Sequence, residues 1–170
     1  MKFRFTGFTL VELLIVIGVL AIISTMLILT MNPLEQIKKS NDSARKSDLA
    51  QIRRALELYY DDNGRYPPSS AQFFIAPITE IQWGNTWQPY MSKLPKDPSA
   101  GNTYIYYAPP SAGGQTYYLF AHLERGAKDP QSCNNGNVCA SITTGGPGFP
   151  TGNVCGDTCN YGVTSTNVSP

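Results

Sequence analysis

The longest apolar run of the chain lies in its first fifth. From Leu13 to Leu34, 22 consecutive residues carry no charge, and most of them are Leu, Ile, Val, Met or Ala. As a helix this run would be about 33 Å long, which is enough to cross a bilayer core of about 30 Å. A secretory signal has a shorter apolar core, and a buried core helix is rarely so long. The run therefore predicts a membrane-spanning helix over residues 8–34.

A second, amphipathic helix is predicted over residues 35–64. Apolar residues recur there at three- to four-residue steps: Ile37, Ala44, Leu49, Ile52, Leu56 and Tyr59 or Tyr60. Pro33 favours a kink or a helix end between the two segments, and Gly64 suits the position after a helix. Six basic residues mostly occupy the other faces: Lys38, Lys39, Arg45, Lys46, Arg53 and Arg54. We interpret them as a solvated surface rather than a DNA-binding one.

Residues 65–170 predict a small head that contains a β-sheet. Two segments rich in β-forming residues, 103–108 and 116–124, flank a loop of Pro and Gly and predict a hairpin. A third strand is expected over residues 138–142. We expect this antiparallel sheet to pack on the amphipathic helix. The fold class is therefore α+β, with a long amino-terminal helical spine on a small antiparallel sheet.

The composition argues against several functions. The 170 residues include 13 Lys+Arg and 12 Asp+Glu, which gives a net charge of +1. That balance does not suit a globally basic nucleic-acid binder or an acidic disordered chain. The sequence contains no phosphate-binding loop, no nucleophile with an evident base and no zinc-hydrolase motif. We therefore expect that the protein is not an enzyme.

All four cysteines lie in the last quarter of the chain: Cys133, Cys139, Cys155 and Cys159. Four cysteines allow three disulfide pairings, and the sequence does not choose among them. Disulfides would brace a tail rich in Gly and Asn, and they form in exported proteins. Zinc binding is the alternative, although the spacings are unusual for zinc and the single histidine, His122, falls in a predicted strand.

The segment Gly7-Phe8-Thr9-Leu10-Val11-Glu12-Leu13-Leu14-Ile15-Val16-Ile17 closely resembles the amino-terminal signature of type IV pilins and type II secretion pseudopilins. The resemblance implies that a prepilin peptidase cuts this chain between Gly7 and Phe8 and so removes a short basic leader over residues 1–7. It also implies that Phe8 is then N-methylated. Glu12 is costly at the entrance of a membrane helix unless it has a partner. We expect it to pair with the new amine of Phe8 on the next subunit and so to fix the register of assembly.

The resemblance also implies partners and a location. The subunit would be a single-pass membrane protein, surrounded by lipid, with an exported carboxyl-terminal head. An inner-membrane assembly platform and its ATPase would then incorporate it into a homopolymeric, extracytoplasmic filament, either a pilus or a secretion pseudopilus. The alternative is an anchored binding module that does not polymerise, such as an adhesin or a DNA-uptake receptor. For a filament subunit, the sequence does not indicate DNA as a partner.

A second resemblance covers Leu94 to Tyr107 and favours the secretion system. The major pseudopilin of type II secretion carries a Leu-Pro-x-Asp-Pro turn before a Tyr-x-Tyr strand, as this chain does. The chain departs from that pattern at residues 99–101, where Ser-Ala-Gly replaces Trp-Gly. Acidic residues bind calcium in that family, but they are sparse here, and calcium needs six to eight oxygen ligands. We therefore expect no cofactor, with calcium at Asp97, Glu124 and Asp129 as the alternative.

Overall fold

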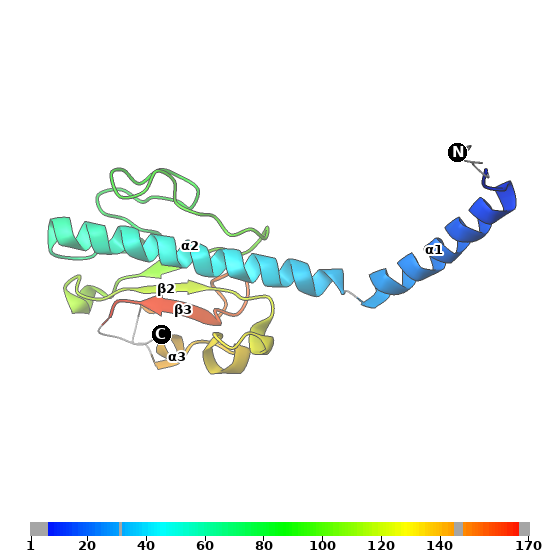
Figure 1. The fold of residues 1–170 in the computed structure, drawn as a ribbon. Coiled ribbons are helices and arrows are strands. Elements are labelled where there is room, and N and C mark those ends of the chain that lie inside the picture. Colours follow the sequence, from blue (N-terminus) through cyan, green and yellow to red (C-terminus); the bar gives the residue numbers. More distant parts are fainter. Residues whose placement is uncertain (1–6, 31, 145–147, 167–170) are drawn as a thin grey trace. The chain divides into compact units, whose positions relative to one another are not determined.

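The computed structural model describes residues 7–30, 32–144 and 148–166, apart from the side chains of residues 28–30 and 144. The chain divides into two compact units, one ending at Gln36 and the other beginning at Ile37. The first unit contains helix α1, Leu10–Thr30, and the start of helix α2, Pro33–Asn63. The second contains the rest of α2 and a three-stranded sheet (Figure 1).

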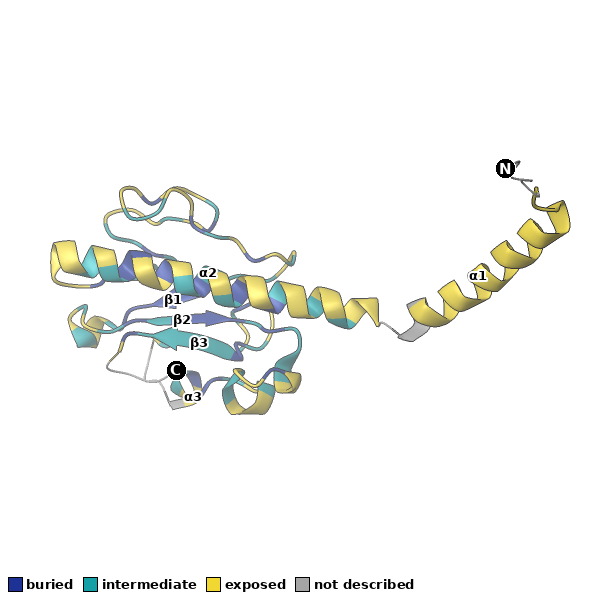
Figure 2. Ribbon diagram, in the orientation of Figure 1, coloured by how far each residue is buried: buried dark blue, intermediate teal, exposed yellow. Residues whose placement is uncertain are grey.

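Helix α1 exposes its apolar side chains. Every large apolar residue from Phe8 to Leu27 has at least half of its surface exposed, and Figure 2 shows this part of α1 in the colour of exposed residues. Within the described part of the chain, α1 is the one helix that is long and apolar enough to cross a membrane. So large an apolar surface requires either lipid or another protein to cover it.

Helix α2 has clear chemical signals at both ends. Pro33 occupies its first position, where the missing backbone N–H removes no helical hydrogen bond. The break that Pro33 predicts is therefore an end of α1 followed by a new helix. At the other end, Gly64 adopts a φ of +68°, and its N–H donates to the carbonyl of Tyr60 at 2.7 Å. This left-handed residue closes the helix.

The sheet is antiparallel with the strand order β1-β2-β3. Its strands are β1, Ile105–Tyr107, β2, Tyr118–Ala121, and β3, Tyr161–Thr164. Short helical segments lie outside the sheet: Pro110–Ala112, Gly126–Lys128, Cys133–Gly136 and helix α3, Ala140–Thr144. The α+β class predicted from the sequence is thus confirmed.

The two faces of the sheet bury different side chains. On the α2 side, Tyr106 and Leu119 join Leu49, Ile52 and Leu56 of the helix in the main core, together with Trp83 and Trp87. On the other side, Ile105 lies opposite Phe120 and packs with three of the cysteines and Ile142 in a second cluster. Side chains alternate between faces along a strand, and this alternation separates the two clusters.

The third strand predicted over residues 138–142 is wrong. Residues 138 and 139 lie in a loop, and residues 140–142 begin α3. The N–H of Ile142 donates to the carbonyl of Cys139 at 3.0 Å, and the side chain of Ile142 enters the second cluster. The actual third strand, β3, lies at Tyr161–Thr164. Its register with β2 places Val163 opposite Leu119, so its strand state depends on a long-range pairing.

Candidate functional site

The amino-terminal motif lies at the first turn of α1. Gly7 and Phe8 are exposed and precede the helix, so the bond between them is not held in secondary structure. Thr9 occupies the capping position before Leu10. Its hydroxyl accepts a hydrogen bond from the backbone N–H of Glu12 at 3.2 Å, and its own N–H donates to the Glu12 carboxylate at 3.3 Å.

These reciprocal bonds form a capping box, in which two otherwise unpaired backbone N–H groups find side-chain acceptors. The Thr9 hydroxyl also donates to the same Glu12 oxygen at 3.2 Å. Within a single copy, the Glu12 carboxylate therefore has a local partner as well as the intersubunit role that we expect from the sequence. The Thr-x-x-Glu spacing before an apolar run is the sequence signal that could have predicted the capping role of Glu12.

A second polar site lies inside the head and is centred on Arg45. We expected Arg45 on a solvated face of α2, and that expectation is wrong, because its side chain is 0 % exposed. The buried face of α2 runs through Asp42, Arg45, Leu49 and Ile52, whereas Ala44, expected in the apolar stripe, is exposed. Ile37, also expected there, is 56 % exposed. The first two residues of the buried face, Asp42 and Arg45, are therefore charged rather than apolar.

The Arg45 guanidinium contacts three carboxylates. Its Nε and Nη2 donate to the two oxygens of Asp97, each at 2.9 Å, in a bidentate pair. Its Nη1 donates to Asp42 Oδ1 at 2.9 Å, and Nη2 also reaches Glu124 Oε1 at 2.9 Å. The hydroxyl of Ser99 accepts a further bond from Nη2 at 2.8 Å. One cation thus ties α2 to the Asp97 turn and to the segment that follows β2.

The surrounding groups complete this network. The Asp42 carboxylate accepts backbone N–H bonds from Glu124 at 2.8 Å and Arg125 at 3.0 Å. One position further along α2, Lys46 Nζ contacts both oxygens of Asp129, at 2.6 and 2.7 Å. Buried carboxylates are tolerated when they have both a cation and hydrogen-bond donors, and Asp42 has both.

The acid strengths of two carboxyl groups reflect these contacts. Burial alone would raise the pKa of Glu124, but hydrogen bonds from Ser99, Arg45 and Asn41 lower it to about 2. Burial likewise opposes ionisation of Asp129, and the contacts with Lys46 outweigh it, so that its pKa lies below its usual value. Both carboxylates are therefore charged at neutral pH and stabilise the fold in that form.

The three residues considered as calcium ligands lie in this region. Asp97 and Glu124 contact Arg45, and Asp129 contacts Lys46. Among the described residues, no group of three or more His, Cys, Asp or Glu side chains is arranged to hold a metal ion. No cofactor is indicated, and the geometry found is that of a structural ion-pair network.

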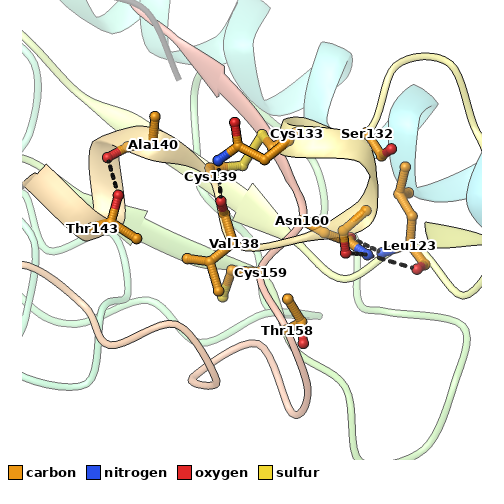
Figure 3. Close-up of a disulfide and its surroundings, with 12 residues drawn as sticks. Leu123, Ser132, Cys133, Val138, Cys139, Ala140, Thr143, Thr158, Cys159 and Asn160 are labelled. Carbon is orange, nitrogen blue, oxygen red and sulfur yellow. Dashed lines mark hydrogen bonds between the residues drawn. A yellow bond between two sulfur atoms is a disulfide. The ribbon is translucent and has the colours of Figure 1, made fainter. Parts of the chain in front are cut away.

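The cysteines close two short rings. Cys133 pairs with Cys139 and Cys155 with Cys159, which leaves no free thiol for the alternative zinc site. The rings are linked through the N–H of Cys139, which donates to the carbonyl of Cys159 at 3.1 Å. Figure 3 shows the first ring beside the buried amide of Asn160, which accepts from the N–H of Leu123 at 2.6 Å and donates to its carbonyl at 3.0 Å.

An exposed apolar helix that opens with Gly-Phe and a Thr-x-x-Glu cap, followed by an amphipathic helix packed on a small antiparallel sheet, defines a pilin-like protein. The family model for the prokaryotic N-terminal methylation motif matches residues 2–28. The model for type II secretion system (T2SS), protein G, matches residues 32–136, which extends from α2 through β2 to the first disulfide. The chain belongs to the type II secretion system protein G family, and the family resemblance predicted from the sequence is confirmed.

Individual relatives agree with this assignment. The chain is 33% identical over 135 residues to the type II secretion system core protein G of Pseudomonas aeruginosa, a match that covers 73% of this chain and 89% of the relative. It is 31% identical over 111 residues to the core protein G of Vibrio cholerae, which covers 64% and 74%. No solved structure gave a significant match. The second disulfide and β3 lie beyond the segment that the protein G model matches.

Proposed function

We propose that this chain is a pseudopilin that polymerises through α1 into the filament of a type II protein secretion system. The observation that carries the proposal is the amino terminus, where the motif Gly7-Phe8 precedes a capped helix whose large apolar side chains are all exposed as far as Leu27. Before assembly, lipid would cover this helix, and in the filament the helices of other copies would replace the lipid. Both surroundings suit a uniformly apolar surface.

Processing would create the charge that Glu12 needs. Removal of residues 1–7 by a prepilin peptidase leaves a new amine at Phe8, which is then methylated and keeps its positive charge. At about 4 Å, a pair between this amine and Glu12 of the next subunit is worth roughly 1 kcal/mol in water and about 4 kcal/mol at an effective dielectric constant of 20. Exclusion of water from the filament interior therefore makes the pair selective for correct register.

The head would lie on the exported side of the membrane. The two disulfides support this location, because they persist in oxidising compartments. Assembly would require a membrane platform and an ATPase, since the chain offers no phosphate-binding loop of its own. We assign the chain a structural role, with mechanical work supplied by these partners.

Two matched substitutions separate the assembly role of Glu12 from its capping role. Glu12→Gln keeps a side chain that can close the capping box but removes the charge, whereas Thr9→Ala removes the cap and keeps the charge. We expect both variants to be cleaved and methylated, as seen by mass spectrometry of the amino-terminal peptide. Glu12→Gln, like Glu12→Val, should lower the yield of sheared filaments at least tenfold, about 1.4 kcal/mol per contact. Thr9→Ala should leave the yield within about fivefold of wild type, because a lost cap costs only about 1 kcal/mol.

Immunogold electron microscopy of shear fractions would identify the filaments directly. Normal filament yield from Glu12→Gln would contradict the charge pairing. An intact Met1 in the membrane-bound protein, together with no filaments, would overturn the proposed function itself and favour an anchored binding module.

A further inference from the structure

The single histidine of the chain lies between β2 and the second disulfide ring, which the bond between Cys155 and Cys159 closes. His122 follows directly after β2, and its side chain is 15 % exposed. Its Nδ1 lies 2.8 Å from the carbonyl oxygen of Thr158 in that ring. Because a carbonyl oxygen can only accept a hydrogen bond, Nδ1 carries the hydrogen and donates it. This contact therefore fixes the tautomer of the neutral imidazole.

The other ring nitrogen faces a carboxylate. His122 Nε2 lies 3.9 Å from Oδ2 of Asp157, whose side chain is 65 % exposed. With the hydrogen on Nδ1, the neutral imidazole has a lone pair at Nε2, which makes no favourable contact with a negative oxygen. Protonation places an N–H and a positive charge at this position and turns the contact into an ion pair. The attraction between the two groups therefore exists only in the protonated form.

The Asp157 carboxylate is held in position for this contact. Its Oδ1 accepts the N–H of Thr158 at 2.6 Å and the hydroxyl of the same residue at 3.3 Å, while its Oδ2 is the oxygen near the imidazole. The hydrogen bond from the Thr158 N–H and, after it, the charge of His122 hold the pKa of Asp157 below its usual range. Asp157 is therefore ionised throughout the range in which a histidine ordinarily changes charge, about pH 5 to 8.

Other charged groups do not compete for the imidazole. The described segments that pack on this side of the sheet carry no acidic or basic side chain apart from Asp157: residues 69–75, 99–103, 130–144 and 148–166. Charged side chains on the segment after β2 interact elsewhere: Glu124 with Arg45, and Arg125 with Asp129. The phenol of Tyr118 also lies on this side, and tyrosine ordinarily ionises only at about pH 10. A positive charge on His122 therefore acts on Asp157.

We propose that His122 and Asp157 form a pH-sensitive latch, in which protonation of the imidazole holds the second disulfide ring more firmly against the end of β2. The next residues already join the same two segments without a charge, through the bonds between Leu123 and the buried amide of Asn160. The latch adds to this junction a contact that depends on pH. Since β3 begins two residues after Cys159, the start of β3 should open less often at pH 5.5 than at pH 8.

The rate at which the second disulfide is reduced measures how often the ring opens. Both of its cysteines are 0 % exposed, so a reductant reaches the sulfurs only after opening. Full-length protein in detergent is treated with a phosphine reductant in the presence of a chelator, and the new thiols are alkylated and quantified by peptide mass spectrometry. Rates are compared between proteins at one pH, which cancels the pH dependence of the reductant itself.

Two substitutions remove the ion pair and keep the neutral hydrogen bonds. Asp157→Asn retains an oxygen that can accept the Thr158 N–H, and it should be reduced about threefold faster than wild type at pH 5.5 and equally fast at pH 8, because partly exposed ion pairs are weak. His122→Gln can still donate to Thr158 but cannot become charged, so its rate relative to wild type should rise by the same factor from pH 8 to pH 5.5. The double variant should be no faster than the faster single variant.

Glu80→Gln is the matched control, because it removes an exposed carboxylate elsewhere on the head and should equal wild type at both pH values. Ratios of variant to wild-type rate that are the same at pH 5.5 and pH 8 would overturn the proposal.

Nitrogen NMR of the imidazole tests the geometry without any variant. At pH 8, long-range proton–nitrogen correlations in the full-length protein should place the hydrogen on Nδ1, and Nε2 should gain a hydrogen as the pH is lowered to 5.5. A ring that stays neutral at pH 5.5, or a neutral ring with its hydrogen on Nε2, would overturn the proposal. The latch lies within the head, so if the wild-type chain forms no filaments, the proposed function fails and both measurements still decide the latch.

Discussion

Removal of the Arg45 guanidinium is the strongest test of how the head is held together. Arg45→Met keeps much of the length and the apolar stem of the side chain but deletes the cation that contacts Asp42, Asp97 and Glu124. The Asp97 side chain is 0 % exposed, so water cannot replace the lost partner. Its carboxylate must then either remain charged without a cation or take up a proton, and both are unfavourable at pH 7.

The expected cost is large. Breaking a buried ion pair by removing one partner typically costs about 3–5 kcal/mol, because it leaves an uncompensated charge. For a domain of this size, about 3–5 kcal/mol corresponds to a fall in melting temperature of roughly 10–20 °C. Arg45→Lys should lie between wild type and Arg45→Met, since an ammonium keeps the charge but not the planar fork that reaches both oxygens of Asp97.

Thermal unfolding of the full-length chain in detergent, followed by tryptophan fluorescence, measures this effect. The chain has two tryptophans, and both Trp83 and Trp87 are buried in the main core of the head. Their emission therefore reports the head, without a contribution from α1. Lys46→Met is the comparison variant, because it removes a partly exposed cation from the same helix and leaves Asp129 with the N–H of Gln131 as a donor. It should cost less than Arg45→Met, about 1–2 kcal/mol.

The dependence on pH provides a second criterion. In wild type, the pKa of Glu124 is lowered from 4.5 to about 2, so its contribution to stability is lost progressively as the pH falls between these two values. In Arg45→Met this carboxylate loses that cation and gains less from remaining charged, so the difference in melting temperature between the two proteins should shrink from pH 7 to pH 4. The reasoning would be refuted by a fall no larger than that of Lys46→Met, or by a difference that grows as the pH is lowered.

The remaining predictions concern pH, the disulfides and one glycine. Wild-type melting temperature should fall between about pH 5 and pH 2, since the folded pKa of Glu124, about 2, is depressed below the ordinary 4.5 and its stabilisation of up to about 3 kcal/mol disappears on protonation; a flat profile over this range would contradict this. Reduction of both disulfides should speed amide hydrogen exchange after Cys133 more than in α2, whereas equal acceleration in both would show that the bridges brace the whole head. Gly156→Ala should destabilise the head by at least about 2 kcal/mol, because Gly156 has a φ of +90° and a Cβ would meet the carbonyl oxygen of Gly101; an unchanged melting curve would refute this.

The elements set by local pattern were predictable from the sequence. The length of the apolar run defines α1, and the recurrence of Leu49, Ile52 and Leu56 defines the face of α2 that lies on the sheet. The hairpin of β1 and β2 also follows from its β-forming residues and the loop between them. In contrast, β3 is short and contains Gly162, and its strand state comes from pairing with β2 some forty residues earlier in the chain. No local pattern distinguishes it from the loops around it.

The site was predictable only in part, for a related reason. The amino-terminal motif is contiguous, so the sequence alone singles out Gly7, Phe8 and Glu12. Arg45 is buried by residues that are 52 and 79 positions away, Asp97 and Glu124, and a rule that places charged residues in solvent assigns it to the wrong face. The available signal was geometric, since Asp42 and Arg45 continue the heptad spacing of Leu49 and Ile52 on the buried side.

The small size of the two disulfide rings has a consequence for biogenesis. Their cysteines are separated by six and four residues, the shortest-range arrangement that the four cysteines allow. Loop closure over so few residues is fast and does not await the rest of the fold. For the exported head that we propose, we expect each ring to be oxidised before β3 joins the sheet. Each cysteine therefore pairs with its nearest neighbour in the sequence. We expect that an oxidant alone, without a disulfide isomerase, is enough to form both bridges.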